Sequence, residues 1–296
     1  MMSHGQIRDA AGDRPRGTDA FPGLPALGAG LGFREPFRGE LFLNQSGVDF
    51  LEITADHYFD AAPEKERELD LLAQHFTLIP HGLNLSLGTA EGLDEAYLEK
   101  FAALVARLNP PWWSEHLAFT RAGGIEIGHL TPLPFTREAV DAVERNIAVA
   151  RRRIPVPLIL ENITWSVTLP GAEMTEPEFL RAVLERTGCG LLLDVTNLHT
   201  NAVNHGHAPA AVLDALPLER VVQLHFTGGH ERDGQLIDSH SQPTPPAVWA
   251  LMEQVLARAP VKGIILERDE NLPPFTELLA EVTRARALGR RCGRWT

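Results

Sequence analysis

Acidic and histidine residues in this sequence recur at the ends of short apolar runs, a placement that suits a metal site. The run Leu-Ile-Leu-Glu-Asn ends in Glu161 and Asn162, and Val-Val-Gln-Leu-His ends in His225. A single His or Glu at such a place is more often an ordinary hydrogen-bonded residue. Here the pattern repeats in seven of eight runs, and converging carboxylates repel each other unless a cation neutralises them. The repetition therefore favours a metal site.

The candidate metal ligands carry imidazole or carboxylate groups, and no cysteine lies near them. They are His57, His81, Glu115, Glu161, Asp194, His225, Asp238, His240 and Glu267. Nitrogen and oxygen ligands suit iron, manganese, zinc or cobalt and disfavour a thiolate-type zinc or copper(I) site. The set exceeds the roughly six ligands of one octahedral ion. We therefore expect bridging carboxylates in a cluster of two or three ions.

The apolar runs themselves predict buried parallel strands. They span residues 28–33, 48–54, 76–87, 112–119, 156–163, 190–198, 221–227 and 263–268. Near-continuous apolar runs of this length are typical of strands covered on both faces. Amphipathic segments separate them, at 64–75, 94–108, 137–152, 176–187, 208–216, 246–259 and 274–288. The first connection, 35–47, has the weakest helical signal.

Eight strands alternating with helices predict an α/β protein with a single TIM-type (β/α)8 barrel domain. Barrel enzymes place their catalytic groups at the carboxyl ends of the strands, where the polar residues of this sequence fall. We expect a disordered arm at 1–27, rich in Gly, Pro, Asp and Arg, then the barrel at 28–288 and a basic tail at 289–296.

Composition excludes several classes of protein. The 296 residues carry a formal net charge of −12, which argues against a nucleic-acid partner and against anionic membranes. The two cysteines, Cys189 and Cys292, are far apart, so a disulfide scaffold or an iron–sulfur cluster is not expected. No membrane-spanning run and no secretory signal is found, and a cytoplasmic location follows by default.

In these motifs the sequence resembles the multinuclear non-haem iron-dependent oxidative enzymes, catalogued as domain of unknown function 692, which include methanobactin biosynthesis protein B. The resemblance covers roughly residues 28–285. The matching stretches are His81-Gly82-Leu83, Ser86-Leu87-Gly88, Ser114-Glu115-His116-Leu117, Leu160-Glu161-Asn162, Leu193-Asp194-Val195, Gln223-Leu224-His225, Asp238-Ser239-His240 and Leu266-Glu267-Arg268-Asp269. Each is short, and their order along successive strands makes the set specific.

The resemblance implies two or three iron ions, Fe2+ or Fe3+, and O2 as co-substrate. It implies oxidative modification of a ribosomally made precursor peptide, commonly at cysteine, and a partner protein that presents the leader peptide. His81, Glu115, Glu161, Asp194, His225, Asp238, His240 and Glu267 match the family's metal-site motifs. The resemblance makes Asn162 and Asn197 either metal ligands or residues that support the ligands. The chain departs from the family pattern at His57 and His230.

Three further residues are candidates for roles beside the metal. His116 and Arg268 are expected to orient ligands, although a salt bridge would equally explain either, and His199 is expected to face the substrate. The main alternative function is a metal-dependent sugar isomerase or hydrolase on the same barrel. A catalytically silent binding module is a second alternative, and an endonuclease-type barrel is disfavoured by the acidic charge.

Overall fold

A computed structural model describes residues 18–167 and 169–296 and places eight parallel strands in a closed barrel. The barrel strands are β1 (Gly28–Gly32), β2 (Leu51–Thr54), β3 (Leu78–Gly82), β4 (Trp113–His116), β7 (Leu158–Glu161), β8 (Gly190–Asp194), β9 (Val221–Phe226) and β12 (Gly263–Leu266). Their order around the barrel is β1-β12-β9-β8-β7-β4-β3-β2, and every pairing is parallel. The predicted TIM-type barrel is confirmed, with each strand inside its predicted range.

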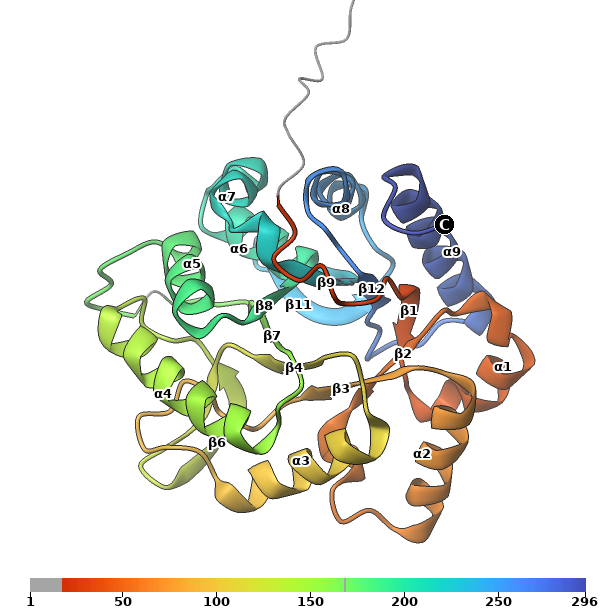
Figure 1. The fold of residues 1–296 in the computed structure, drawn as a ribbon. Helices are drawn as coiled ribbons and strands as arrows, with labels where there is room; N and C mark the ends of the chain where they lie inside the picture. The colour runs from red at the N-terminus through yellow and green to blue at the C-terminus, as the bar shows by residue number, and fades with distance from the viewer. Residues whose placement is uncertain (1–17, 168) are drawn as a thin grey trace, which may run out of the picture.

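Helices surround this ring of strands (Figure 1). They are α1 (Arg38–Leu43), α2 (Pro63–His75), α3 (Glu95–Leu108), α4 (Arg137–Arg153), α5 (Glu176–Thr187), α6 (Val195–Asn204), α7 (Pro209–Ala215), α8 (Pro246–Arg258) and α9 (Phe275–Arg291). Their boundaries follow local signals: Asp94 caps α3 through two backbone N–H groups, and Gly188 ends α5 with a left-handed φ of 68°. No described helix has the length and apolar character needed to cross a membrane.

The barrel interior is layered, and this layering creates the polar site. The lower layer is apolar and fully buried, and consists of Phe50, Ile79, Trp112, Ile159, Leu192, Val222 and Ile265. Because side chains alternate along a strand, the residue two positions further on faces the same interior. That residue is His81 after Ile79, and Glu161 after Ile159. An apolar plug thus lies directly beneath a ring of ionisable groups at the carboxyl ends of the strands.

The segment before β1 differs from the predicted disordered arm. Residues 1–17 lie outside the described part of the chain, but Phe21, Leu24 and Leu27 pack against the apolar lower layer of the barrel. Lys262 binds Asp19, with 2.5 Å between Nζ and Oδ2, and Figure 1 shows this segment crossing the barrel end in red. Residues 18–27 therefore close the amino-terminal face of the barrel, because three apolar side chains cover an otherwise open core.

Removing one of these side chains should destabilise the barrel without touching the polar ring. Leu24→Ala is expected to lower the free energy of unfolding by about 1 kcal/mol, since Leu24 is only partly buried. Urea denaturation measures the change. Leu43→Ala is the matched control, because Leu43 is 85% exposed; equal effects of the two substitutions would show that the segment does not stabilise the barrel.

The structure contains three elements that the sequence did not predict. Helix α6 begins at Val195, inside the predicted sixth strand, because the Asp194 side chain accepts the backbone N–H of Asn197 and caps a helix there. Two antiparallel hairpins also follow barrel strands: β5 (Phe119–Ala122) with β6 (Ile125–Thr131), and β10 (Gly228–Arg232) with β11 (Gln235–Gln242). The predicted basic tail at 289–296 starts within α9, and the Trp295 indole donates to the backbone oxygen of Arg286.

Candidate metal centre

The polar ring at the carboxyl ends of the strands contains three groups of potential ligands. In each group, the ligand atoms lie within 4.8 Å of one another. We call them the inner group (His81, His116 and Glu161), the central group (Glu161, Asp194, His225 and Glu267) and the outer group (His240, Glu267 and Asp269). Glu161 belongs to the first two and Glu267 to the last two. The three groups therefore form one connected cluster joined by two carboxylates, an arrangement that suits more than one cation.

In the inner group, two imidazoles face one carboxylate oxygen. His81 Nδ1 lies 2.8 Å from Ser114 Oγ, and His116 Nδ1 donates to the Gly82 carbonyl at 3.1 Å. Their Nε2 atoms lie 3.2 Å and 3.4 Å from Glu161 Oε2. Glu161 Oε2 and His81 Nε2 are buried and have no hydrogen-bond partner. The outer nitrogens hold the rings in place and leave both Nε2 lone pairs for a shared cation.

In the central group, His225 is surrounded by carboxylates. Its Nδ1 lies 3.2 Å from Glu161 Oε1 and 3.1 Å from Glu267 Oε2. Its Nε2 lies 2.7 Å from Glu52 Oε1, on the opposite side of the ring. Asp194 uses Oδ1 to cap α6, while its Oδ2 is buried and has no hydrogen-bond partner. The free oxygen of Asp194 and Nδ1 of His225 are therefore available as ligands.

The outer group comes from hairpin β10–β11, which lies over the strand ends, and from the end of β12. His240 Nδ1 lies 2.8 Å from Asp269 Oδ2 and 3.6 Å from Glu267 Oε2. Its Nε2 lies 2.8 Å from Asp238 Oδ1, yet both atoms lack a hydrogen-bond partner. The backbone φ of His240 is 49°, in the left-handed region that non-glycine residues rarely adopt. The outer group thus combines one imidazole from the hairpin with two carboxylates from just beyond β12.

Charge interactions within the cluster shift the pKa values strongly. Burial lowers the pKa of His116, but the carboxylates of Glu161 and Glu115 outweigh burial and raise it to about 9. The carboxylates likewise outweigh burial at His225 and His240 and raise their pKa values well above the usual range. Burial, together with the Asp238 and Glu161 carboxylates, raises the pKa of Asp194 to about 7. The cation-free cluster is thus balanced by protons, which a metal ion would displace.

Glu115 and Arg268 lie outside the three groups. Both Glu115 oxygens accept backbone N–H groups, from His116 at 2.8 Å and Leu85 at 3.2 Å. A Cβ at Gly82 would come within 2.4 Å of this carboxylate, so the glycine makes room for it. Arg268 is buried against α9, where its Nη2 lies 3.3 Å from Glu281 Oε1. Arg268 therefore pairs with α9, whereas Glu115 Oε1 also lies 3.6 Å from Nδ1 of His116. His116, expected only to orient ligands, is itself in the inner group, and the expectation that Glu115 binds metal stays a prediction.

The side chains of the two predicted asparagines, Asn162 and Asn197, hydrogen-bond the backbone beside the central group. Asn162 Oδ1 accepts the backbone N–H of Asp194 at 2.9 Å, and its Nδ2 donates to the Asp194 carbonyl at 3.1 Å. The side-chain amide of Asn162 is thus used to fix the end of β8. Asn197 Nδ2 donates to the Asn162 carbonyl at 3.1 Å, while its Oδ1 is buried without a partner. Asn197 therefore retains a free oxygen.

His57, His199 and His230 also lie apart from the three groups. His57 is exposed on the 3-10 turn η3 (Ala55–Tyr58) and lines a cavity of about 300 Å³ beside Asp269. His199 is on α6 and is partly buried. His230 is paired through Nδ1 with Ser239 Oγ at 2.9 Å, across the hairpin. His57 thus lies at a cavity beside the outer group, and the expectation that His199 faces the substrate stays a prediction.

A chain of hydrogen bonds that sequence reasoning missed supports His225. The Trp112 indole donates to Gln223 Oε1 at 2.8 Å, and Gln223 Nε2 donates to Glu52 Oε2 at 2.6 Å. Glu52 in turn faces Nε2 of His225. A carboxylate on the far nitrogen of a ligating histidine fixes its tautomer and makes the ring a stronger ligand. The sequence held one sign of this chain of hydrogen bonds: Glu52 is an acidic residue between Leu51 and Ile53, which are both buried.

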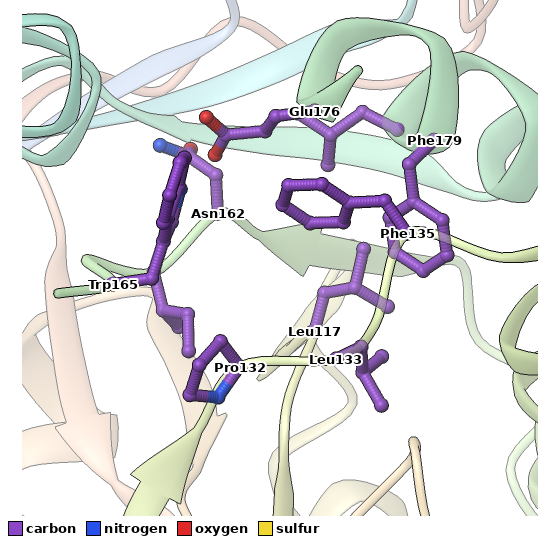
Figure 2. Close-up of a pocket in the computed structure, with 10 residues that line it drawn as sticks. Leu117, Pro132, Leu133, Phe135, Asn162, Trp165, Glu176 and Phe179 are labelled. Atoms are coloured by element: carbon purple, nitrogen blue, oxygen red, sulfur yellow. The ribbon is translucent and has the colours of Figure 1, made fainter. Parts of the chain in front are cut away.

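A small, mostly apolar pocket borders Asn162. Figure 2 shows the Glu176 carboxylate pointing toward Asn162 and the Trp165 indole, with the Phe135 and Phe179 rings to its right. Burial raises the pKa of Glu176 to about 7. The cavity volume is about 20 Å³, room for roughly one water. The pocket is therefore too small for a substrate.

The residues present fit a metal centre. In the inner and central groups, the following atoms are buried without a hydrogen-bond partner: His81 Nε2, Glu161 Oε2 and Asp194 Oδ2. Buried polar atoms are nearly always satisfied, because an unmade hydrogen bond costs about 1–3 kcal/mol. A cation would satisfy such atoms together, and their imidazole and carboxylate chemistry suits divalent transition metals.

Fold and site together define a TIM barrel with a clustered His, Asp and Glu site at the carboxyl ends of its strands. Residues 28–290 match the family model described as "RiPP precursor modification enzyme MbnB/TglH/ChrH", where RiPP denotes a ribosomally made, modified peptide. The chain belongs to this family. It is 39% identical over 264 residues to a UPF0276 protein of Caulobacter vibrioides, covering 89% of this chain and 94% of that protein. A Streptomyces avermitilis UPF0276 protein is 42% identical over 267 residues, covering 88% of this chain but only 54% of that protein.

Solved structures support the fold independently. D-psicose 3-epimerase from Clostridium cellulolyticum H10, solved with D-tagatose, superposes with a TM-score of 0.56 at 14% identity, covering 88% of this chain and 94% of that one. A xylose isomerase domain protein from Planctomyces limnophilus gives a TM-score of 0.53 at 11% identity, covering 94% and 96%. IOLI protein, solved with a bound zinc atom, gives 0.51 at 14% identity, covering 88% and 92%. At these identities the likeness establishes the barrel fold.

Proposed function

We propose that this protein is a non-haem iron enzyme that uses O2 to modify a ribosomally made precursor peptide at a cysteine residue. The observation that carries the proposal is the connected cluster, in which Glu161 and Glu267 each belong to two ligand groups. Membership of a family of precursor-modifying enzymes supports a peptide as the substrate. The proposal includes two or three iron ions and a partner protein that presents the leader peptide.

The cluster residues would hold the ions in three neighbouring positions. Bound iron would supply an open coordination position and a redox centre for O2. The protein's own contribution is to fix the ligands: Ser114 and the Gly82 carbonyl hold the two inner imidazoles. Glu52 holds the proton on Nε2 of His225, which leaves Nδ1 free for ligation. The apolar layer beneath the cluster excludes water from below.

The cavity of about 300 Å³ beside the outer group is the expected approach for the peptide. It is lined by Phe33, Arg34, Glu35, Pro36, Thr54, His57, Tyr58, Lys65, Asp269 and Leu272. Ligand pockets commonly measure about 300–1,000 Å³, so this one suits one or two residues of a peptide. Asp269 links the cavity to the outer group, and His57 lies on its wall, where a side chain of the peptide would contact it.

Anaerobic reconstitution tests the proposal. Purified metal-free protein is loaded with Fe2+, its bound iron is counted by elemental analysis, and it is then exposed to O2 with a cysteine-containing peptide. We expect two or three irons per chain, O2 consumption that depends on the peptide, and a change in peptide mass. A peptide with Ser in place of Cys is the control and should not be modified.

The rival function predicts a different outcome of the same experiment. A metal-dependent sugar isomerase would bind Mn2+, Co2+ or Zn2+, would convert a ketose without O2 and would leave the peptide unchanged. A silent binding module would retain no transition metal after dialysis. Either result would overturn the iron-dependent oxidation proposed here.

A further inference from the structure

Strand β1 is the exception in the polar ring. Its last residue is Gly32, which Phe33 and Arg34 follow directly, and none of the three offers a carboxylate or an imidazole. Instead, the Arg34 guanidinium group reaches the outer group from just beyond the strand. A Cβ at Gly32 would lie 3.3 Å from Arg34 Nη1, so the glycine leaves space for this group. The strand without a metal-type ligand thus contributes a permanent positive charge.

Arg34 contacts two carboxylates of the outer group. Its Nε lies 2.8 Å from Asp269 Oδ1, and its Nη2 contacts that same oxygen. Nη2 also lies 3.3 Å from Glu267 Oε1. The atoms left for a cation are Glu267 Oε2, Asp269 Oδ2 and Nδ1 of His240, which lie close to one another. Arg34 therefore binds the same two carboxylates that an outer cation would need.

The charge balance of the outer group consequently differs from that of the central group. In the outer group, Arg34 offsets one of the two negative charges of Glu267 and Asp269. In the central group, Glu161, Asp194 and Glu267 converge, and Glu52 lies beyond His225. Arg34 is only 19% exposed, so water screens its charge weakly. A divalent cation would meet less net negative charge in the outer group.

We propose that Arg34 is a built-in cation of the cluster that competes with metal for the outer group, so that this group binds its ion more weakly than the other two. The inference rests on the proposed metal centre. In this role Arg34 positions the two carboxylates and balances their charge. It thereby controls how fully metal occupies the outer group.

Equilibrium dialysis of the metal-free protein against Co2+, with elemental analysis of bound metal, tests this role. Arg34→Gln is expected to tighten binding of the last ion by roughly tenfold or more, because a unit charge close to the site is removed. Arg34→Lys keeps the charge, and its affinity should stay near that of the wild type. Arg38→Gln is the matched control, because Arg38 pairs with Glu68, which belongs to none of the three groups.

The possible results separate the two proposals. Last-ion affinity that is unchanged or weaker in Arg34→Gln would overturn the role of Arg34 while leaving the metal centre intact. A wild-type protein that retains no Co2+ would instead overturn the metal centre itself. If Arg34→Gln does not fold, as judged by circular dichroism, Arg34→Met replaces it with the same expectation, since it also removes the charge.

Discussion

Replacing Glu161 with alanine is expected to abolish binding of the ions in both the inner and the central group. Glu161 belongs to both groups, and its two oxygens face different imidazoles: Oε2 faces His81 and His116, and Oε1 faces His225. Losing an orienting partner alone costs about 10–100-fold in metal affinity, so losing a shared ligand should cost at least about 100-fold. Elemental analysis after dialysis measures the loss.

Glu115→Ala is the matched control for this prediction. Glu115 is equally buried and lies on the neighbouring strand β4, but its oxygens accept backbone N–H groups. Its removal should cost stability, because two buried donors lose their acceptor, and should cost less metal than Glu161→Ala, because Glu115 contacts only one ligand of the inner group, His116. Full metal content in Glu161→Ala, or equal loss in both variants, would contradict the assignment of Glu161 as the shared ligand.

Much of the fold could be predicted from the sequence, because most barrel strands are apolar runs followed by a polar residue. Where the prediction was wrong, a side chain changed the local structure. The apolar residues after Asp194 read as more strand, but the Asp194 side chain caps a helix that starts at Val195. The two hairpins were not expected, because residues 119–131 and 228–242 lack the long apolar runs that marked the barrel strands.

The sequence predicted the kinds of ligand in the candidate site, but not which individual residues belong to it. Neighbouring residues of a strand face opposite ways, so Glu115 and His116 cannot both point into the barrel. The sequence alone did not show which one does, and the structure places His116 in the inner group. Arg34 carried no signal, since a lone arginine after a short strand is ordinary, and its role depends on two carboxylates that lie 233 and 235 residues further along the chain.

The metal-free protein is expected to lose stability as the pH rises from 6.5 to 9. The pKa of His116 is raised in the folded state, to about 9 from the ordinary 6.5. Such a group stabilises the fold fully below its unfolded pKa, and the contribution is lost as the pH rises through the folded value. His225 and His240, whose pKa values are also raised, act in the same direction. The pKa of Asp194, raised from 3.8 to about 7, adds a penalty that grows between those two values.

The expected loss of stability can be estimated from the pKa shift of His116, and the metal-bound protein is the control. The shift at His116 corresponds to about 3 kcal/mol, which is a fall in Tm of roughly 5–10 °C. Differential scanning calorimetry at pH 6.5 and pH 9 measures it on metal-free protein. With a divalent cation bound, the imidazoles are ligands and carry no extra proton, so Tm should stay level or rise over the same range. A metal-free protein whose Tm does not fall would show that protons do not balance the cluster's carboxylates. The difference in Tm between metal-bound and metal-free protein should therefore increase with pH, because the cation replaces the protons that balance the carboxylates at lower pH.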